Sequence, residues 1–178
     1  MSTSEPSPAI ASPSPTATPT VTPTTPSSQP SVTSPWFDYR VRVQPHHTDY
    51  AGIVWHGAYV NWMEEARVEC LRSHGINFSD LVELGCDLPV VELSIRYRRS
   101  LKMGMEALVS TRMQERDGVR LNWVYSIQSL DRKTQYVTAV VTLVPVDRAR
   151  GKILRQLPLI LEKALDLCLG IVDNAPRA

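Results

Sequence analysis

The sequence predicts an α+β domain in which a five-stranded antiparallel sheet wraps around one long central helix. Five stretches alternate apolar and polar residues with a period of two, as half-buried strands do. Between the first and second of them the apolar residues change to the period of a helix. Two of the segments that join the later stretches are only a few residues long, and strands joined in this way are antiparallel neighbours.

The expected strands follow one another along the chain. They cover residues 37–43, 91–98, 105–113, 121–127 and 136–146. Asp117-Gly118 joins the third stretch to the fourth and is a favoured hairpin turn. Residues 131–134, Asp-Arg-Lys-Thr, join the fourth to the fifth. The last three strands should therefore be antiparallel neighbours.

Three further segments are expected to be helical, and two of them have helical periodicity. In the longest, apolar residues recur at i, i+3, i+4, i+7 and i+11, namely Tyr59, Trp62, Met63, Ala66 and Cys70. Its charged residues, which include Glu65, Arg67, Glu69 and Arg72, are expected mostly off this stripe, and Gly75 is expected to end the helix. A short helix is expected near residues 79–84. A C-terminal helix is expected over 157–168, with Pro158 in its first turn and Gly170 at its end.

Residues 1–35 differ in composition from the rest of the chain. They hold 9 of the 14 prolines, 17 serines or threonines, and one charged residue, Glu5. Such a segment cannot bury enough apolar surface to offset the entropy lost on ordering, so it is expected to be a disordered, passive linker. The remaining roughly 140 residues suit one compact domain. This domain is expected over residues 36–170, followed by a short C-terminal tail over 171–178.

Charge and cysteine content argue against several classes of protein. From Trp36 on, the chain holds 19 basic and 17 acidic residues, a balance of +2 (19 − 17), whereas a nucleic-acid interface needs a strongly basic face. Cys70, Cys86 and Cys168 lie far apart, and no pair has the spacing of a metal or redox motif. No apolar run approaches the roughly 20 residues that cross a bilayer. The N-terminus also lacks the features of a secretory signal, so a cytoplasmic protein is expected.

The segment that carries chemistry joins the first strand to the long helix. Asp49 stands in this loop, followed by the small pair Ala51-Gly52, which lets the backbone turn sharply or approach a ligand. His56 and Gly57 fall at the expected start of the helix, where free backbone N–H groups and the helix dipole attract a developing negative charge. Asp49 is therefore a candidate base or nucleophile beside an oxyanion site. The same pattern also fits a capping carboxylate, the commoner role of an acidic residue before a helix.

Residues 49–69 resemble the signature of the 4-hydroxybenzoyl-CoA thioesterase family, including its acyl-CoA thioesterase branch associated with the Tol-Pal system. Asp-Tyr-Ala-Gly-Ile-Val-Trp at 49–55 matches the family run Asp-x-[Ala/Gly]-Gly-[Ile/Val]-Val-[Tyr/Trp]. His-Gly-Ala-Tyr at 56–59 and Glu-Glu-Ala-Arg-Val-Glu at 64–69 continue the match without a gap. The resemblance extends at lower density over residues 36 to about 168. It implies the hotdog fold, a sheet of five strands around a long helix, assembled as a homodimer or homotetramer.

The resemblance also implies an acyl-CoA thioesterase that needs no metal or redox cofactor. Asp49 would be the catalytic carboxylate, either as a general base on water or as a nucleophile that forms a mixed anhydride. His56 would orient or protonate the reacting groups, and the backbone N–H groups near His56 and Gly57 would polarise the thioester carbonyl. Tyr59 and Glu64 fall on motif positions and are candidate substrate-binding residues.

Two departures from the family pattern keep alternatives open. Ala58 replaces the family's asparagine, and residues 100–105 read Ser-Leu-Lys-Met-Gly-Met, without the proline and aspartate of the family's Pro-x-x-x-Gly-Asp. The first departure favours a non-catalytic acyl-CoA-binding protein with the same fold, whereas the presence of Asp49 and His56 argues against it. An acyl-carrier-protein thioesterase is a further alternative. A hotdog dehydratase is disfavoured, because no Asp-x-x-x-x-His pattern occurs here.

A group of basic residues at the end of the second expected strand and just beyond it could bind the phosphates of coenzyme A, or could form an ordinary solvated or ion-paired face. Its members are Arg96, Arg98, Arg99 and Lys102. His46 and His47, taken with Asp49 and His56, fit no standard zinc spacing, so no metal is expected there. Self-association is expected, because a single sheet leaves apolar positions and an unpaired edge.

Overall fold

The structure, a computed structural model, describes residues 35–114 and 116–171 of the 178-residue chain. The predicted tail over residues 1–35 lies outside this part except for Pro35. The predicted tail over 171–178 lies outside it except for Ile171. Both tails, and the limits 36–170 of the predicted domain, stay predictions.

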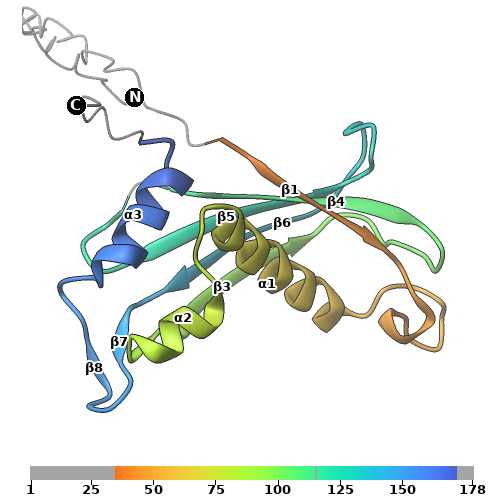
Figure 1. The fold of residues 1–178 in the computed structure, drawn as a ribbon. Helices are drawn as coiled ribbons and strands as arrows, with labels where there is room; N and C mark the ends of the chain where they lie inside the picture. The colour runs from red at the N-terminus through yellow and green to blue at the C-terminus, as the bar shows by residue number, and fades with distance from the viewer. Residues whose placement is uncertain (1–34, 115, 172–178) are drawn as a thin grey trace, which may run out of the picture. The chain divides into compact units, whose positions relative to one another are not determined.

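One antiparallel sheet of five strands dominates the fold (Figure 1). Its strands are β1 (Phe37–Arg42), β3 (Val90–Tyr97), β4 (Glu106–Met113), β5 (Leu121–Gln128) and β6 (Gln135–Leu143), in the order β1-β4-β5-β6-β3. All five predicted strands are present, and β4, β5 and β6 are neighbours as their short connections predict. β6 ends three residues earlier than predicted, because Pro145 lacks the backbone N–H that a ladder needs.

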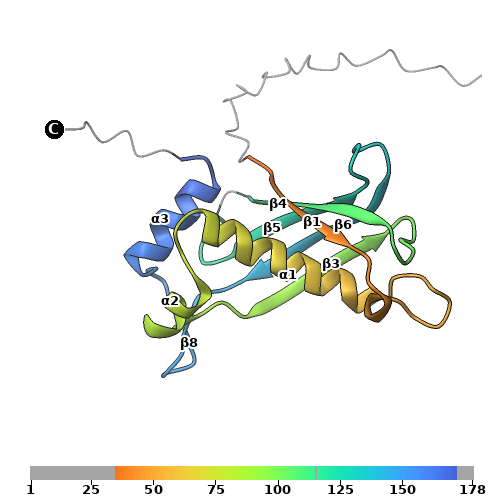
Figure 2. The ribbon, with the colours of Figure 1, turned by 45° about the vertical axis from the view of Figure 1, so that its right-hand side comes forward.

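The long helix α1 (His56–Ser73) lies across one face of the sheet and packs on β1 and β4, as both views show (Figure 1, Figure 2). All five residues of the predicted apolar stripe are buried. Gly75 follows the helix with φ +86°, a backbone conformation that side chains other than glycine rarely adopt. The predicted α+β architecture, with one helix held by a five-stranded sheet, is therefore confirmed.

Most of the shorter elements lie at one end of the sheet (Figure 1). The helices α2 (Phe78–Glu83) and α3 (Leu159–Cys168) lie close to the ranges where they are expected. Pro158, expected in the first turn of the C-terminal helix, is instead the N-cap residue of α3. The sequence does not predict the 3₁₀-helix η1 (Pro45–His47) or the small sheet of β2 (Cys86–Asp87), β7 (Val146–Asp147) and β8 (Lys152–Ile153), because two- and three-residue elements show no periodicity. Within the described residues, no helix combines the length and the apolar character that a membrane span requires.

One charged residue of α1, Arg67, lies inside the protein, which its expected position off the apolar stripe does not predict. Arg67 is only 5% exposed, and its Nη1 donates a hydrogen bond of 3.0 Å to the Tyr125 hydroxyl on β5. Arg67 follows Met63 by four positions and precedes Cys70 by three, so it borders the buried stripe. The long apolar stem of arginine then carries its charge across the core to the sheet.

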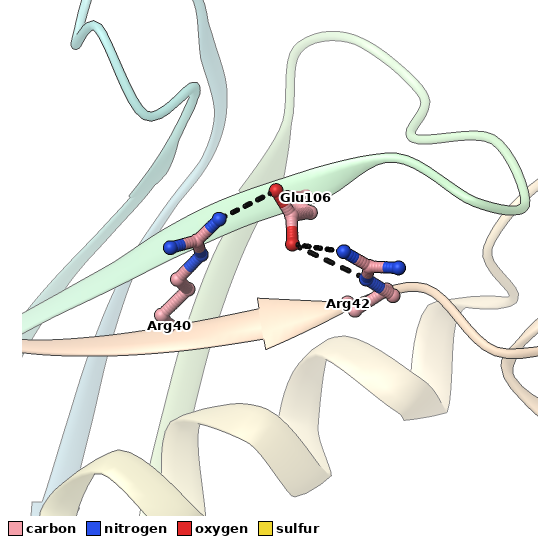
Figure 3. Close-up of polar contacts among 3 residues, drawn as sticks. All are labelled: Arg40, Arg42 and Glu106. Atoms are coloured by element: carbon pink, nitrogen blue, oxygen red, sulfur yellow. Dashed lines mark hydrogen bonds and ion pairs between the residues drawn. The ribbon is translucent and has the colours of Figure 1, made fainter.

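The face of the sheet opposite α1 is largely polar. On it, Glu106 of β4 accepts hydrogen bonds from Arg40 at 2.7 Å and from Arg42 at 2.9 Å, both on β1 (Figure 3). These two guanidinium groups hold the pKa of Glu106 below its usual range. The edge strand β3 also exposes apolar side chains, since Val90, Val91, Leu93 and Tyr97 are 41–51% exposed.

Candidate active site

The loop between β1 and α1 is a tight hairpin that carries Asp49. The Asp49 N–H donates to the Ile53 carbonyl at 2.9 Å, and the Gly52 N–H donates to the Asp49 carbonyl at 3.0 Å. Gly52 has φ +71°, which the turn requires and which glycine adopts without strain. At the base of the hairpin, the Trp55 N–H donates to the His47 carbonyl at 3.1 Å. The backbone itself therefore fixes where Asp49 stands.

A second loop, between β3 and β4, pairs with this hairpin. The Val54 N–H donates to the Leu101 carbonyl at 2.9 Å, and the Met103 N–H donates to the Gly52 carbonyl at 3.4 Å. Ile53 and Lys102 form an antiparallel bridge between these two bonds. No sequence pattern signals this pairing, because neither loop has the alternation of a strand.

The Asp49 carboxylate is half-buried, and one of its oxygens bonds to its own turn. Oδ1 accepts hydrogen bonds from the N–H groups of Ala51 at 2.8 Å and Ile53 at 3.4 Å. This is the turn-forming role that aspartate often has in loops. Among the described residues, no hydrogen bond reaches Oδ2 of Asp49. The arrangement orients the carboxylate and leaves one oxygen for a water molecule or a substrate.

The start of α1 offers hydrogen-bond donors. Trp55 is the N-cap residue, and its side chain forms no capping hydrogen bond. Within the described part of the chain, the backbone N–H groups of His56 and Gly57 form no hydrogen bond, as expected for the first turn of a helix. The His56 side chain is exposed. The backbone carbonyl of His56 accepts a hydrogen bond of 3.2 Å from the Tyr97 hydroxyl. No hydrogen bond or ion pair joins His56 to Asp49 among these residues.

Gly57 is needed because the Trp55 indole lies against it. A Cβ atom added at Gly57 would stand 2.1 Å from Cη2 of Trp55. Any larger residue must therefore displace the indole or the first turn of α1. Trp55, 42% exposed, packs its indole against this first turn, which carries the two free N–H groups.

Tyr59 and Glu64, the two candidate substrate-binding residues on α1, lie in different surroundings. Tyr59 is 3% exposed, and its hydroxyl accepts a hydrogen bond of 3.2 Å from the Leu101 N–H. Burial raises the pKa of Tyr59. Glu64 is exposed, with its carboxylate 4.0 Å from the Arg67 guanidinium. The contacts of Tyr59 anchor the second loop, and substrate contact by either residue stays a prediction.

The four candidate phosphate-binding residues lie on different parts of the molecule. Arg96 and Arg98 line a groove with Trp36 on the sheet face opposite α1. Arg98 and Arg99 are also the first two residues of the loop that pairs with the Asp49 hairpin, and Lys102 is part of the pairing itself. The four residues are therefore divided between the groove opposite α1 and the loop beside the Asp49 hairpin.

Three aromatic rings, those of His47, Trp62 and Tyr59, pack in a row between the hairpin and α1. The sequence does not predict the part played by His47. The ring centroids of His47 and Trp62 are 5.0 Å apart, and those of Trp62 and Tyr59 are 5.5 Å apart. Nδ1 of His47 accepts a hydrogen bond of 3.0 Å from the Gln44 N–H, and burial lowers the pKa of His47. Trp62 and Tyr59 are on the predicted stripe, whereas nothing in the spacing of His47 marks it as a support.

Comparisons with known proteins agree with this architecture. Residues 43–165 match the family model of the Thioesterase-like superfamily. The Synechocystis protein sll0410, whose name marks it as a candidate esterase, is 53% identical over 135 residues, which cover 76% of this chain and 81% of that protein. Bacillus subtilis YneP, named as a candidate acyl-CoA thioesterase, is 33% identical over 87 residues, which cover 49% of this chain and 63% of that protein. Slr0204, a 1,4-dihydroxy-2-naphthoyl-CoA thioesterase from Synechocystis, has a crystal structure that matches with a TM-score of 0.68 at 23% identity, covering 74% of this chain and 96% of that one.

These likenesses confirm the predicted hotdog fold and the predicted class of enzyme, a thioester hydrolase. They do not single out the 4-hydroxybenzoyl-CoA branch, which stays a prediction. With 123 residues inside the matched range (43–165) and a relative that is 53% identical, the chain belongs to the Thioesterase-like superfamily.

Proposed function

We propose that the protein hydrolyses the thioester bond of an acyl-CoA or aroyl-CoA, with Asp49 as the catalytic carboxylate. The observation that carries the proposal is the placement of Asp49. A half-buried carboxylate is fixed through one oxygen on a backbone-bonded hairpin, and the hairpin leads directly into the uncapped start of α1. General bases and nucleophiles need such fixed geometry beside donors for the oxyanion.

Two routes use the same groups. As a general base, Asp49 takes a proton from a water molecule that attacks the thioester carbon. As a nucleophile, its free oxygen attacks that carbon, and water then hydrolyses the mixed anhydride. In both routes the N–H groups of His56 and Gly57 stabilise the oxyanion, and the products are a carboxylic acid and coenzyme A. His56 would orient or protonate the leaving thiolate.

Phosphate binding by the second loop would fit this arrangement. Arg99 and Lys102 belong to the loop that pairs with the Asp49 hairpin, so they are the candidates for coenzyme A phosphates bound on the same subunit. Arg96 and Arg98 could reach a phosphate only on the other face of the sheet or on another subunit. A location in the cytoplasm also remains a proposal.

A non-catalytic acyl-CoA-binding protein is the second candidate, and one observation favours it. Ala58, which replaces the family's asparagine, is 1% exposed and brings no polar group to the site. A panel of short, long and aromatic acyl-CoAs, together with an acyl-carrier-protein thioester, separates the candidates when thiol release is followed. Hydrolysis of one class supports the proposed function, whereas binding without thiol release from any substrate supports the second candidate.

The Gly57→Ala substitution should lower kcat by up to about 10²-fold, a loss comparable to removal of one oxyanion donor. The added Cβ atom would overlap the Trp55 indole and displace the first turn of α1. The double variant Trp55→Ala/Gly57→Ala removes the overlap and should recover most of the activity. Kinetics of both variants on the same acyl-CoA check this. Wild-type kcat in the single variant would show that the turn has no part in catalysis.

Self-association should proceed through the edge strand β3. Leu93 is 41% exposed on the sheet face that α1 covers elsewhere, and β3 leaves one row of backbone groups unpaired in the single chain. Leu93→Glu should therefore reduce a dimer or tetramer to smaller species in light scattering at micromolar concentration. Leu130→Glu, at an equally exposed position (40%) between β5 and β6, is the matched control. A wild-type monomer would contradict the expectation of an oligomer.

A further inference from the structure

The C-terminal ends of α1 and α3 meet at three side chains of the kind that bind soft metal ions. Cys70 of α1 and Cys168, the last residue of α3, are each 3% exposed, and their Sγ atoms lie 3.9 Å apart. His74 follows α1 directly and is half-buried. The possible ligand atoms of all three residues lie within 4.8 Å of one another. The two cysteines are 98 positions apart, which is why the sequence predicts no metal site.

The geometry of the cluster suits a tetrahedral metal site. Zinc–sulfur bonds of about 2.3 Å place two sulfur ligands about 3.8 Å apart at tetrahedral angles, close to the separation observed between Cys70 and Cys168. A disulfide would need the same atoms at about 2.05 Å. Cys70 and His74 are four positions apart, the spacing that places two side chains on one side of a helix. Closure around an ion requires shifts of about an ångström from the present positions.

We propose that Cys70, His74 and Cys168 bind one zinc-class divalent ion that fastens α3 to α1. Two thiolates and a neutral imidazole balance the charge of such an ion, and thiolates select soft metals. Both helices end at the cluster, so the negative ends of their dipoles favour a cation there. The half-buried His74 gives an ion access from solvent, and a water molecule completes the tetrahedron.

The cluster is distinct from the proposed active site. The 14 positions from His56 to Cys70 (70 − 56) correspond to about 21 Å along the helix. The metal would therefore hold the C-terminal helix in place and take no part in thioester hydrolysis. Metal binding and thioester hydrolysis are therefore tested separately, and a negative result for one proposal does not refute the other.

Cobalt(II) titration of the reduced, chelator-treated full chain tests the site. We expect one ion per chain, with thiolate-to-cobalt charge-transfer absorption and the visible bands of tetrahedral cobalt, displaced by zinc. Cys168→Ser should lower the charge-transfer absorption to that of one thiolate or less, because only Cys70 remains as a sulfur ligand. His74→Ala should weaken binding by more than the 10- to 100-fold that is typical when an outer-shell partner is lost. Cys86→Ser, which removes a buried thiol outside the cluster, should bind cobalt as the wild type does.

Three results would overturn the proposal. The first is the absence of charge-transfer absorption in the reduced wild type, which decides the matter even if a variant does not fold. The second is an unchanged spectrum in a folded Cys168→Ser variant, which would place the ion elsewhere. The third is a reduced protein that binds no cobalt but forms a Cys70–Cys168 disulfide on oxidation, which would identify a redox pair instead.

Discussion

The Asp49→Asn variant should hydrolyse acyl-CoA about 10²- to 10⁴-fold more slowly than the wild type, the usual cost of losing general-base catalysis. Its melting temperature should hardly change. The introduced asparagine amide keeps an oxygen that can accept the hydrogen bonds of Ala51 and Ile53, so the hairpin survives. The substitution removes the ability to take a proton or to attack a carbonyl. Acyl-CoA binding should persist, because the substitution also removes the repulsion between the Asp49 carboxylate and the anionic ligand.

Asp80→Asn is the matched control for this substitution. Asp80 is also half-buried, and its carboxylate accepts a hydrogen bond of 2.7 Å from the Asn77 N–H at the start of α2. It has a capping role outside the candidate site, so its loss should leave turnover unchanged. Turnover and melting temperature are measured on the same purified samples. Near-normal turnover in the Asp49 variant, with a small drop in melting temperature, would show that this carboxylate is only a structural cap.

The Tyr125→Phe variant should unfold more easily by about 1.5–3 kcal/mol, the range for a hydrogen bond to a charged group. Tyr125 is 1% exposed, and its hydroxyl is the buried partner of the Arg67 guanidinium. Burial raises the pKa of Tyr125, and the charge and hydrogen bond of Arg67 only partly offset this effect. Without the hydroxyl, a positive charge remains in the core with no buried hydrogen-bond partner among the described residues.

The double variant Arg67→Met/Tyr125→Phe should recover most of the lost stability. Replacing a buried charge and its hydrogen-bond partner together with apolar residues of similar volume is often neutral or stabilising, whereas removing one partner is not. Tyr136→Phe is the control, since Tyr136 is also buried and forms no side-chain hydrogen bond with the described residues. Denaturant unfolding of the four proteins measures these differences. A Tyr125→Phe variant as stable as Tyr136→Phe would show that the Arg67 contact contributes nothing.

The main sheet and α1 could be predicted because their burial repeats along the chain. Trp123, Tyr125 and Ile127 alternate with polar or half-buried residues on β5, and the Tyr59 to Cys70 stripe has helical spacing. This periodicity shows which side chains of a single strand or helix are buried. It also located the Asp49 loop, because a helix that starts at His56 needs a connection from the preceding strand.

Contacts between distant segments left no comparable signal. The pairing of residues 52–54 with 101–103 joins two loops without alternation, yet it fixes the hairpin that carries Asp49. The meeting of Cys70 with Cys168 depends on how α3 packs against α1. The burial of Arg67 depends on Tyr125, a residue 58 positions away. Each feature is set by tertiary packing, which a one-dimensional pattern does not record.

Multiple-turnover reaction of the full-length protein with an acyl-CoA in heavy-oxygen water tests the central claim most directly. Mass spectrometry of the products distinguishes hydrolysis from binding, because hydrolysis transfers one solvent oxygen to the released acid. We expect free coenzyme A and labelled acid in equal amounts, from at least one substrate of the panel. Recovery of bound but intact acyl-CoA, with no labelled acid from any thioester, would contradict thioester hydrolysis by this protein.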